Sequence, residues 1–79
     1  MRSVKKVKYL NDYKLEVEFN SGETKIVDLS NHLDGEIFEP LKKVEYFKTV
    51  KVNPGFETIY WDNGADIALE FLFDIGRDK

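Results

Sequence analysis

The chain has 79 residues, no cysteine and a formal net charge of −3 at pH 7. This length suits a single domain, residues 1–79, near the lower limit for a chain that folds alone. The lack of cysteine excludes disulfides, thiolate nucleophiles and cysteine zinc sites. No apolar run approaches the roughly 18 residues of a membrane span, and no signal-peptide pattern begins the chain, so we expect a soluble cytoplasmic protein.

Charge is distributed unevenly along the chain. Residues 1–14 carry a net charge of +4, residues 15–39 carry −6, residues 40–54 carry +3 and residues 55–79 carry −4. Pairing of opposite charges across the strands of one sheet explains this alternation, and we favour that interpretation. The alternative is a basic face, built from the two positive segments, that meets an acidic partner or a phosphate backbone. The net negative charge argues against a general nucleic-acid binder.

The first predicted element is an antiparallel hairpin of residues 4–10 and 13–19. Apolar and polar side chains alternate strictly along the second of these segments, which is typical of a half-buried strand. A loop at residues 11–13 sets apolar residues opposite apolar ones and lysines opposite glutamates, whereas a slip of one residue mixes the two kinds. The predicted opposing pairs are Tyr9 and Leu15, Val7 and Val17, Lys8 and Glu16, and Lys6 and Glu18.

A second hairpin is predicted at residues 20–23, where Gly22 can adopt a positive φ. Residues 4–29 then form a three-stranded antiparallel meander with one apolar face. The predicted opposing pairs of the second hairpin are Phe19 and Thr24, Glu18 and Lys25, and Val17 and Ile26. The predicted apolar face consists of Val7, Tyr9, Leu15, Val17, Phe19 and Ile26.

The middle of the chain, residues 30–47, is predicted to hold a short helical segment. Ser30 can cap a single turn that ends at Gly35. Pro40 suits the first position of a helix over residues 41–47. The expected inward residues of this helix, at helical spacing, are Leu41, Val44 and Phe47.

The last third of the chain is predicted to contain another hairpin and then a helix. Residues 48–52 and 58–61 form the strands, and Asn53-Pro54-Gly55 forms a turn. Asp66 is expected to cap a helix over residues 67–75. Gly76 is expected just beyond the end of that helix. The expected stripe of this helix is Ile67, Phe71 and Ile75.

Together these elements predict an α+β fold. It combines a small antiparallel sheet, made of a three-stranded meander plus a second hairpin, with a short middle helical segment and a C-terminal helix. Five short strands do not readily close into a barrel, so at least two strand edges should stay open, protected by lysines such as Lys5, Lys6, Lys48 and Lys51. We therefore expect self-association through a sheet edge, because a second copy can bury further apolar surface.

The sequence offers no dense catalytic or metal site. His32 is the single histidine, and its serine and aspartate neighbours do not have the spacing of a triad, so we interpret it as a polar turn residue. Asp62 and Asp66 supply too few oxygen ligands for an EF-hand loop, and turn formation and helix capping account for them. The glycines are scattered without a phosphate-binding pattern. We predict no enzyme activity, no cofactor and no metal.

Three aromatic residues form the candidate interaction surface: Tyr60, Trp61 and Tyr46. Tyr60 and Trp61 point to opposite faces of a regular strand, so one should be core and the other partly exposed. The exposed ring, beside Tyr46 or Tyr13, could anchor a partner. The alternative is that these aromatics only cover the core of a small domain.

The order and spacing of several segments, over nearly the whole chain, resemble a bacterial family of uncharacterised proteins, domain-of-unknown-function family 2442. The resemblance implies an α+β fold and carries no catalytic residues. The segments are Val7-Lys8-Tyr9, Tyr13-Lys14-Leu15-Glu16-Val17-Glu18-Phe19, Ser21-Gly22-Glu23, Val27-Asp28-Leu29, Gly35-Glu36-Ile37-Phe38-Glu39-Pro40-Leu41, Phe47-Lys48-Thr49-Val50 and Ile59-Tyr60-Trp61-Asp62-Asn63-Gly64-Ala65-Asp66-Ile67.

The neighbouring genes and fused domains of such proteins imply an interaction or regulatory module. They occur alone, beside another small uncharacterised protein, or ahead of a helix-turn-helix domain, and the antitoxin-like member of a two-protein system is one such module. The leading hypothesis is a non-catalytic domain that binds a protein partner. The alternative is a small-molecule-binding regulatory domain that uses a cleft between the sheet and the middle segment.

Overall fold

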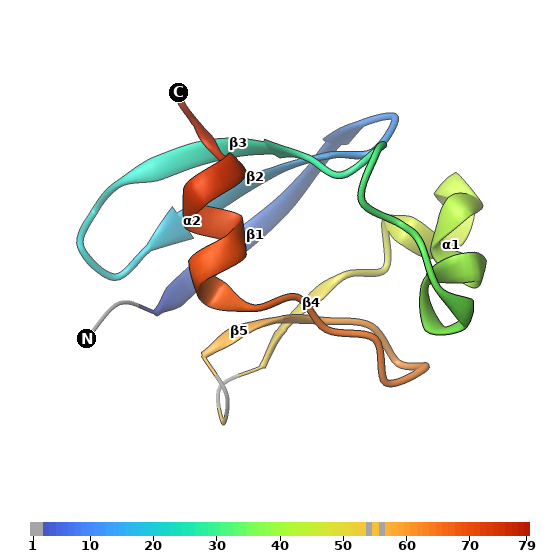
Figure 1. Cartoon of the computed structure of the whole chain (residues 1–79). Coiled ribbons are helices and arrows are strands. Elements are labelled where there is room, and N and C mark those ends of the chain that lie inside the picture. The colour runs from blue at the N-terminus through green and yellow to red at the C-terminus, as the bar shows by residue number, and fades with distance from the viewer. Residues whose placement is uncertain (1–2, 54, 56) are drawn as a thin grey trace.

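The computed structural model describes residues 3–53, 55 and 57–79. In chain order the elements are β1 (Val4–Asn11), β2 (Lys14–Phe19), β3 (Thr24–Asp28), the 3-10 helix η1 (Glu36–Lys42), α1 (Val44–Phe47), β4 (Lys51–Asn53), β5 (Thr58–Tyr60), α2 (Leu69–Ile75) and β6 (Arg77–Asp78). Four strands form an antiparallel sheet in the order β1-β2-β3-β6, and β4 and β5 form a separate hairpin. The predicted α+β class is confirmed (Figure 1).

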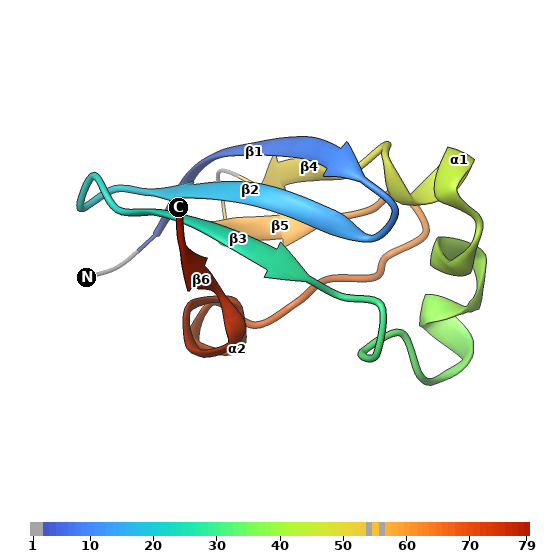
Figure 2. The same cartoon turned by 90° about the horizontal axis from the view of Figure 1, so that it is seen from above.

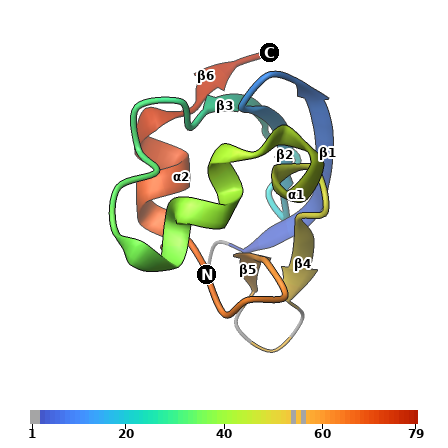
Figure 3. The same cartoon turned by 90° about the vertical axis from the view of Figure 1, so that its right-hand side faces the viewer.

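The sheet and the β4–β5 hairpin lie on opposite sides of one core (Figures 1 and 2). Helix α2 packs against β3 and covers one side of the molecule, while η1 and α1 close one end (Figure 3). Ten of the core side chains are fully buried, which is how so short a chain removes enough apolar surface from water. These are Trp61, Phe19, Phe47, Leu15, Leu29, Leu41, Ile59, Leu72, Val17 and Val27.

The register of the first hairpin is confirmed. All four predicted pairs are present in the structure, with Val7 opposite Val17 and Lys8 opposite Glu16 among them. Apolar side chains therefore share the inner face of β1 and β2, and oppositely charged side chains share the outer face. The period-2 pattern was sufficient here because a slip by one residue would bury the charged set.

The register predicted for the second hairpin is wrong by one residue. Val17 lies opposite Lys25, and Leu15 lies opposite Val27. The cause is the turn: the Phe19 amide donates to the Glu23 carbonyl oxygen at 2.8 Å, so the loop has three residues instead of four. Gly22 takes the positive φ of +93° that such a loop requires. Val27 consequently points into the core, whereas Ile26 lies on the outer face.

The middle segment is helical, but its limits differ from the prediction. The turn at residues 30–31 depends on Asp28, whose Oδ1 accepts a hydrogen bond from the Ser30 amide at 3.0 Å, and not on a Ser30 cap. Helical winding starts at Glu36, so Pro40 lies inside η1 and not at a helix start. Lys43 has an extended backbone, with φ −88° and ψ 119°, and so separates the 3-10 helix from the α-helical turn that follows it.

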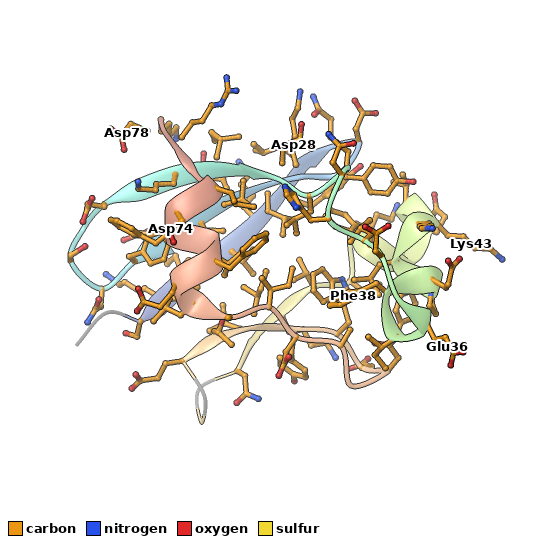
Figure 4. The ribbon with its side chains drawn as sticks, in the orientation of Figure 1. Asp28, Glu36, Phe38, Lys43, Asp74 and Asp78 are labelled. Atoms are coloured by element: carbon orange, nitrogen blue, oxygen red, sulfur yellow. The ribbon has the colours of Figure 1, made fainter. Side chains whose placement is uncertain are left out.

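The inward stripe of this segment is confirmed at its two ends. Leu41 and Phe47 are fully buried, and Val44 is half-buried. Phe38, which also packs against the core, points inward from η1, while Glu36 and Lys43 lie on its outer side (Figure 4).

Strand β4 is shorter than predicted. The amides of Thr49 and Val50 donate back to the carbonyl oxygens of Tyr46 and Phe47, at 3.0 and 3.3 Å, and so continue the turn after α1. Strand pairing therefore begins only at Lys51. In the following turn, Oδ1 of Asn53 accepts from the Gly55 amide at 2.8 Å, and Pro54 lies outside the described residues.

The prediction that Asp66 caps the last helix is wrong. Helix α2 begins at Leu69 with Ala68 at the N-cap position and no side-chain cap. Asp66 instead forms a β-bridge with Tyr60, and the Thr58 hydroxyl donates to the Ile67 carbonyl oxygen at 2.7 Å. These backbone-directed contacts keep residues 66–67 extended alongside β5, so the helix starts later than the sequence indicated.

The late start turns a different face of α2 toward the core. Leu72 is fully buried, while Leu69, Phe73 and Ile75 are half-buried. Phe71, a member of the predicted stripe, is 37% exposed. Ile67 and Ile75, the other two members, do lie in or against the core, but Ile67 precedes the helix, so the helical spacing counted from it placed Phe71 wrongly.

Gly76 follows α2 as predicted, but glycine is not needed there for a left-handed φ. Its φ is −67°. A Cβ atom at this position would lie 2.9 Å from the Leu72 carbonyl oxygen and 2.9 Å from Cβ of Lys25. The close approach allows the chain to turn from α2 into β6, an edge strand that the sequence did not predict and that pairs with β3.

We expect Thr58→Val to lower the free energy of unfolding by about 1–3 kcal/mol, because it leaves the buried Ile67 carbonyl without its donor. Asp66→Ala, which removes an exposed side chain without a capping role, should change it by less than about 0.5 kcal/mol. Urea titrations followed by Trp61 fluorescence measure both values. A larger loss for Asp66→Ala than for Thr58→Val would contradict this account of the β5–α2 connection.

Candidate functional site

Trp61, one of the three predicted surface aromatics, is a core residue. Its side chain is fully buried, and its indole Nε1 donates to the Phe47 carbonyl oxygen at 2.8 Å. Its ring lies 5.7 Å from the ring of Phe47, centroid to centroid. Trp61 therefore cannot present a surface to a partner in this structure.

Tyr60 and Tyr46 remain partly exposed. Tyr60 is directly opposite Lys51 in the β4–β5 ladder. The ammonium of Lys51 lies 3.0 Å from Oδ1 of Asp62, and this hydrogen bond and charge raise the pKa of Lys51, with smaller contributions from Tyr60 and Tyr46. Of the three predicted aromatics, Tyr60 is therefore the one placed directly beside Lys51.

Lys51 also lines an open groove of about 610 Å³ between β1 and β4, which we call the β1–β4 groove. Strands β1 and β4 run near one another on the side of the molecule away from α2 (Figure 3), and residues of both line the groove. The lining residues are Lys5, Lys6, Val7, Lys8, Glu16, Glu18, Val50, Lys51 and Val52.

The groove exists because β1 and β4 approach without pairing. The Val4 amide donates to the Glu57 carbonyl oxygen at 2.9 Å, which ties the start of β1 to the β4–β5 connection. From Lys5 to Leu10, no backbone hydrogen bond joins the outer edge of β1 to any other described residue. The backbone donors and acceptors of that edge therefore face the groove or solvent.

Lysines outnumber acids in the groove by four to two. Lys5 lies 3.7 Å from Glu18, with both side chains partly exposed. Lys6 and Lys8 form no close ion pair with any described residue, although they face Glu18 and Glu16 across the β1–β2 ladder and the charge of Lys8 helps to lower the pKa of Glu16. Glu16 is bound from outside the groove by Lys79, whose hydrogen bond at 2.9 Å lowers the pKa of Glu16. Each of the two glutamates therefore has a lysine partner, and lysines remain in excess among the residues that line the groove.

The lysine-rich character of the groove was indicated by the sequence, but its location was not. Of the two positive segments, residues 1–14 contribute Lys5, Lys6 and Lys8 to the groove, whereas residues 40–54 contribute one lysine, Lys51. Cross-strand pairing of charges is also present, since Lys6 and Lys8 lie opposite Glu18 and Glu16. The half-buried Val50 and Val52 were missed as site residues because they belong to the pattern of an ordinary strand.

A second, smaller hollow of about 350 Å³ lies on the outer face of β3 and is lined by Lys14, Ile26, Asp28, Ile75 and Arg77. Asp28 stabilises the turn that follows β3. Hydrogen bonds from the Ser30 amide and hydroxyl lower the pKa of Asp28, with a smaller contribution from the charge of Lys14. The hollow therefore surrounds a turn-forming carboxylate whose partners are in place.

His32, the single histidine, is exposed and packs edge-to-face on Phe71 with ring centroids 5.0 Å apart. Within residues 3–53, 55 and 57–79, no three histidine, aspartate or glutamate side chains gather closely enough to hold a metal ion. The described helices include none with the length and apolar character needed to cross a bilayer.

Trp61→Phe should lower the free energy of unfolding by about 2–4 kcal/mol, because it leaves a cavity and removes the donor to the Phe47 carbonyl. Tyr60→Phe, which removes a hydroxyl with no described hydrogen bond, should change it by less than about 0.5 kcal/mol. Urea unfolding followed by far-ultraviolet circular dichroism compares the two. Equal effects would show that Trp61 is not the core residue described here.

Asp28 should give the stability of the chain a pH dependence. Its folded-state pKa is lowered, so its contribution is present above the unfolded-state pKa and is lost as the pH falls through the folded-state pKa. Asp28→Asn should therefore lower the free energy of unfolding at pH 7, by about 0.5 kcal/mol for so exposed a group. The difference should shrink in acid. Denaturation curves at pH 7, 5 and 3 test this, and a difference that grows toward pH 3 would refute it.

The model of the family described as "Protein of unknown function (DUF2442)" matches residues 4–78, nearly the whole chain. The chain matches no curated protein and no solved structure.

Proposed function

This chain belongs to the DUF2442 family, and we propose that it is a non-catalytic protein-interaction domain that binds its partner in the β1–β4 groove. The observation that carries the proposal is the unpaired outer edge of β1 beside the half-buried Val50 and Val52. An open strand edge offers a partner backbone hydrogen bonds, and neighbouring apolar side chains offer it surface to bury.

The shape of the groove favours a polypeptide over a small molecule. A small-molecule site encloses most of its ligand and directs a few polar groups at it. The β1–β4 groove is open, and its polar groups are spread along it: lysines on β1, two glutamates on β2 and Lys51 on the facing side. This arrangement supports contact with an extended ligand, and so it supports the interaction hypothesis over a small-molecule-binding regulatory domain.

The proposal assigns no chemistry to the groove. Its glutamates, Glu16 and Glu18, are paired with Lys79 and Lys5, and its remaining titratable groups are lysines exposed to solvent. The partner in this proposal is a second protein, and an antitoxin-like pairing with another small protein is the form that fits the resemblance of the sequence.

Site-specific photocrosslinking in the native cell tests where a partner binds. A benzoylphenylalanine placed at Lys6, in the groove, should give a crosslinked product, and one placed at Lys43 should give none. Both positions are exposed lysines, but Lys43 lies on the outer side of the middle helical segment (Figure 4). Mass spectrometry of the product identifies the partner, and a product of twice the mass of the chain identifies a second copy.

Crosslinks at position 43 and none at position 6 would place the interaction elsewhere and overturn the proposal. Crosslinks at neither position, with the neighbouring gene product co-expressed, would overturn it as well. The control is matched because both substitutions remove one lysine from an exposed position and add the same bulky ring.

A further inference from the structure

The open edge of β1 has room for one short extended segment. Lys5 to Leu10 have no backbone partner on their outer side among the described residues, and the Val4 amide, bonded to Glu57, marks where the open edge begins. Six residues of strand extend about 20 Å. A segment of five or six residues could pair along this length, as extended peptides do when they add to a sheet.

The side chains around that edge alternate in character. Successive residues of a strand point to opposite sides. Val7 lies on the inner side of β1, toward Val50 and Val52, while Lys6 and Lys8 lie on the outer side. A segment paired with β1 therefore meets apolar side chains on one of its sides and lysines on the other.

The charges on the outer side fit acidic residues. Lys6 and Lys8 face Glu18 and Glu16 across the β1–β2 ladder, but these glutamates are already bonded to Lys5 and Lys79, so lysines are in excess on this face. Directly opposed charges of unlike sign stabilise neighbouring strands. Lys51, on the facing rim, is paired with Asp62 at 3.0 Å, so the positive potential that attracts an acidic segment comes from the lysines of β1.

The same lysines disfavour two other occupants. Antiparallel pairing of β1 with β1 of a second copy would bring lysines of one chain beside lysines of the other, which is destabilising. A nucleic acid would use the lysines through its phosphates but would leave the backbone edge and the valines without contacts.

We infer that the partner adds a strand of alternating acidic and apolar residues to the outer edge of β1, an inference that rests on the proposed function. Its acidic side chains lie against Lys6 and Lys8, and its apolar side chains cover Val7, Val50 and Val52. The backbone of the added strand supplies the hydrogen bonds that β1 lacks on this side.

The test measures binding of a fluorescein-labelled peptide, Glu-Val-Glu-Ile-Glu-Val-Glu, to the full chain by fluorescence anisotropy. A copy of the peptide with every second amide N-methylated, along its pairing edge, keeps the charges but cannot form the ladder. A third peptide has the same composition with acidic and apolar residues in two blocks. The parent peptide should bind, and the other two should bind at least about tenfold more weakly.

Two double variants test the location. Lys6→Gln with Lys8→Gln should weaken binding of the parent peptide about fivefold to tenfold, since two exposed charge pairs are lost. Lys42→Gln with Lys43→Gln removes the same charge from the middle helical segment and should leave the affinity within about twofold. Thermal unfolding checks that both variants fold. If one variant does not fold, the comparison of the three peptides on the parent chain still tests the inference.

The inference is overturned if the N-methylated or block peptide binds as well as the parent, if a single-stranded oligonucleotide displaces it, or if the Lys42/Lys43 variant weakens binding as much as the Lys6/Lys8 variant. Failure of the peptide together with crosslinks at position 6 overturns the acidic strand alone and leaves the proposed function standing. Failure of both overturns both.

Discussion

The fold depends on the contact between Trp61 and Phe47. Both side chains are fully buried, their rings touch, and the indole donates to the Phe47 carbonyl. Phe47 in turn meets the rings of Tyr9 and Tyr13, edge-to-face, from the first hairpin. One cluster thus fastens the middle helical segment, the β4–β5 hairpin and the sheet to each other. In a domain with so little interior, these large rings supply much of the buried apolar surface that stabilises it.

That cluster also explains why one side of the molecule stays open. Phe47 is buried in the core, and the turn that follows α1 extends to Val50. Strand β4 therefore begins only at Lys51 and has three residues. The short strand crosses near β1 but offers no ladder to it. On the opposite side, α2 fills the corresponding space by packing on β3. The β1–β4 groove is therefore a direct result of how the aromatic core positions β4.

The candidate site was only partly predictable from the sequence. The positive charge of residues 1–14 and 40–54 suggested a basic face, but the second segment contributes one lysine to the groove, Lys51, which is paired with Asp62. Trp61 was equally plausible as core or surface, because a strand residue at a turn shows no face until its neighbours are placed. Its hydrogen bond to Phe47, fourteen residues earlier, decides for the core. The valines of the groove carry no sequence pattern that separates them from core residues.

The sequence by itself determined the α+β class and the register of the first hairpin, because strict alternation leaves one pairing that keeps charges out of the core. The tertiary structure decided the loop length and the helix start where the local sequence signals were ambiguous. The Gly22 turn fitted two loop lengths, and the burial of Val27 with Leu15 goes with the shorter one. Asp66 looked like a helix cap, but contacts of β5 with residues 66–67 hold the chain extended there. These outcomes depend on contacts between distant segments, which no local pattern contains.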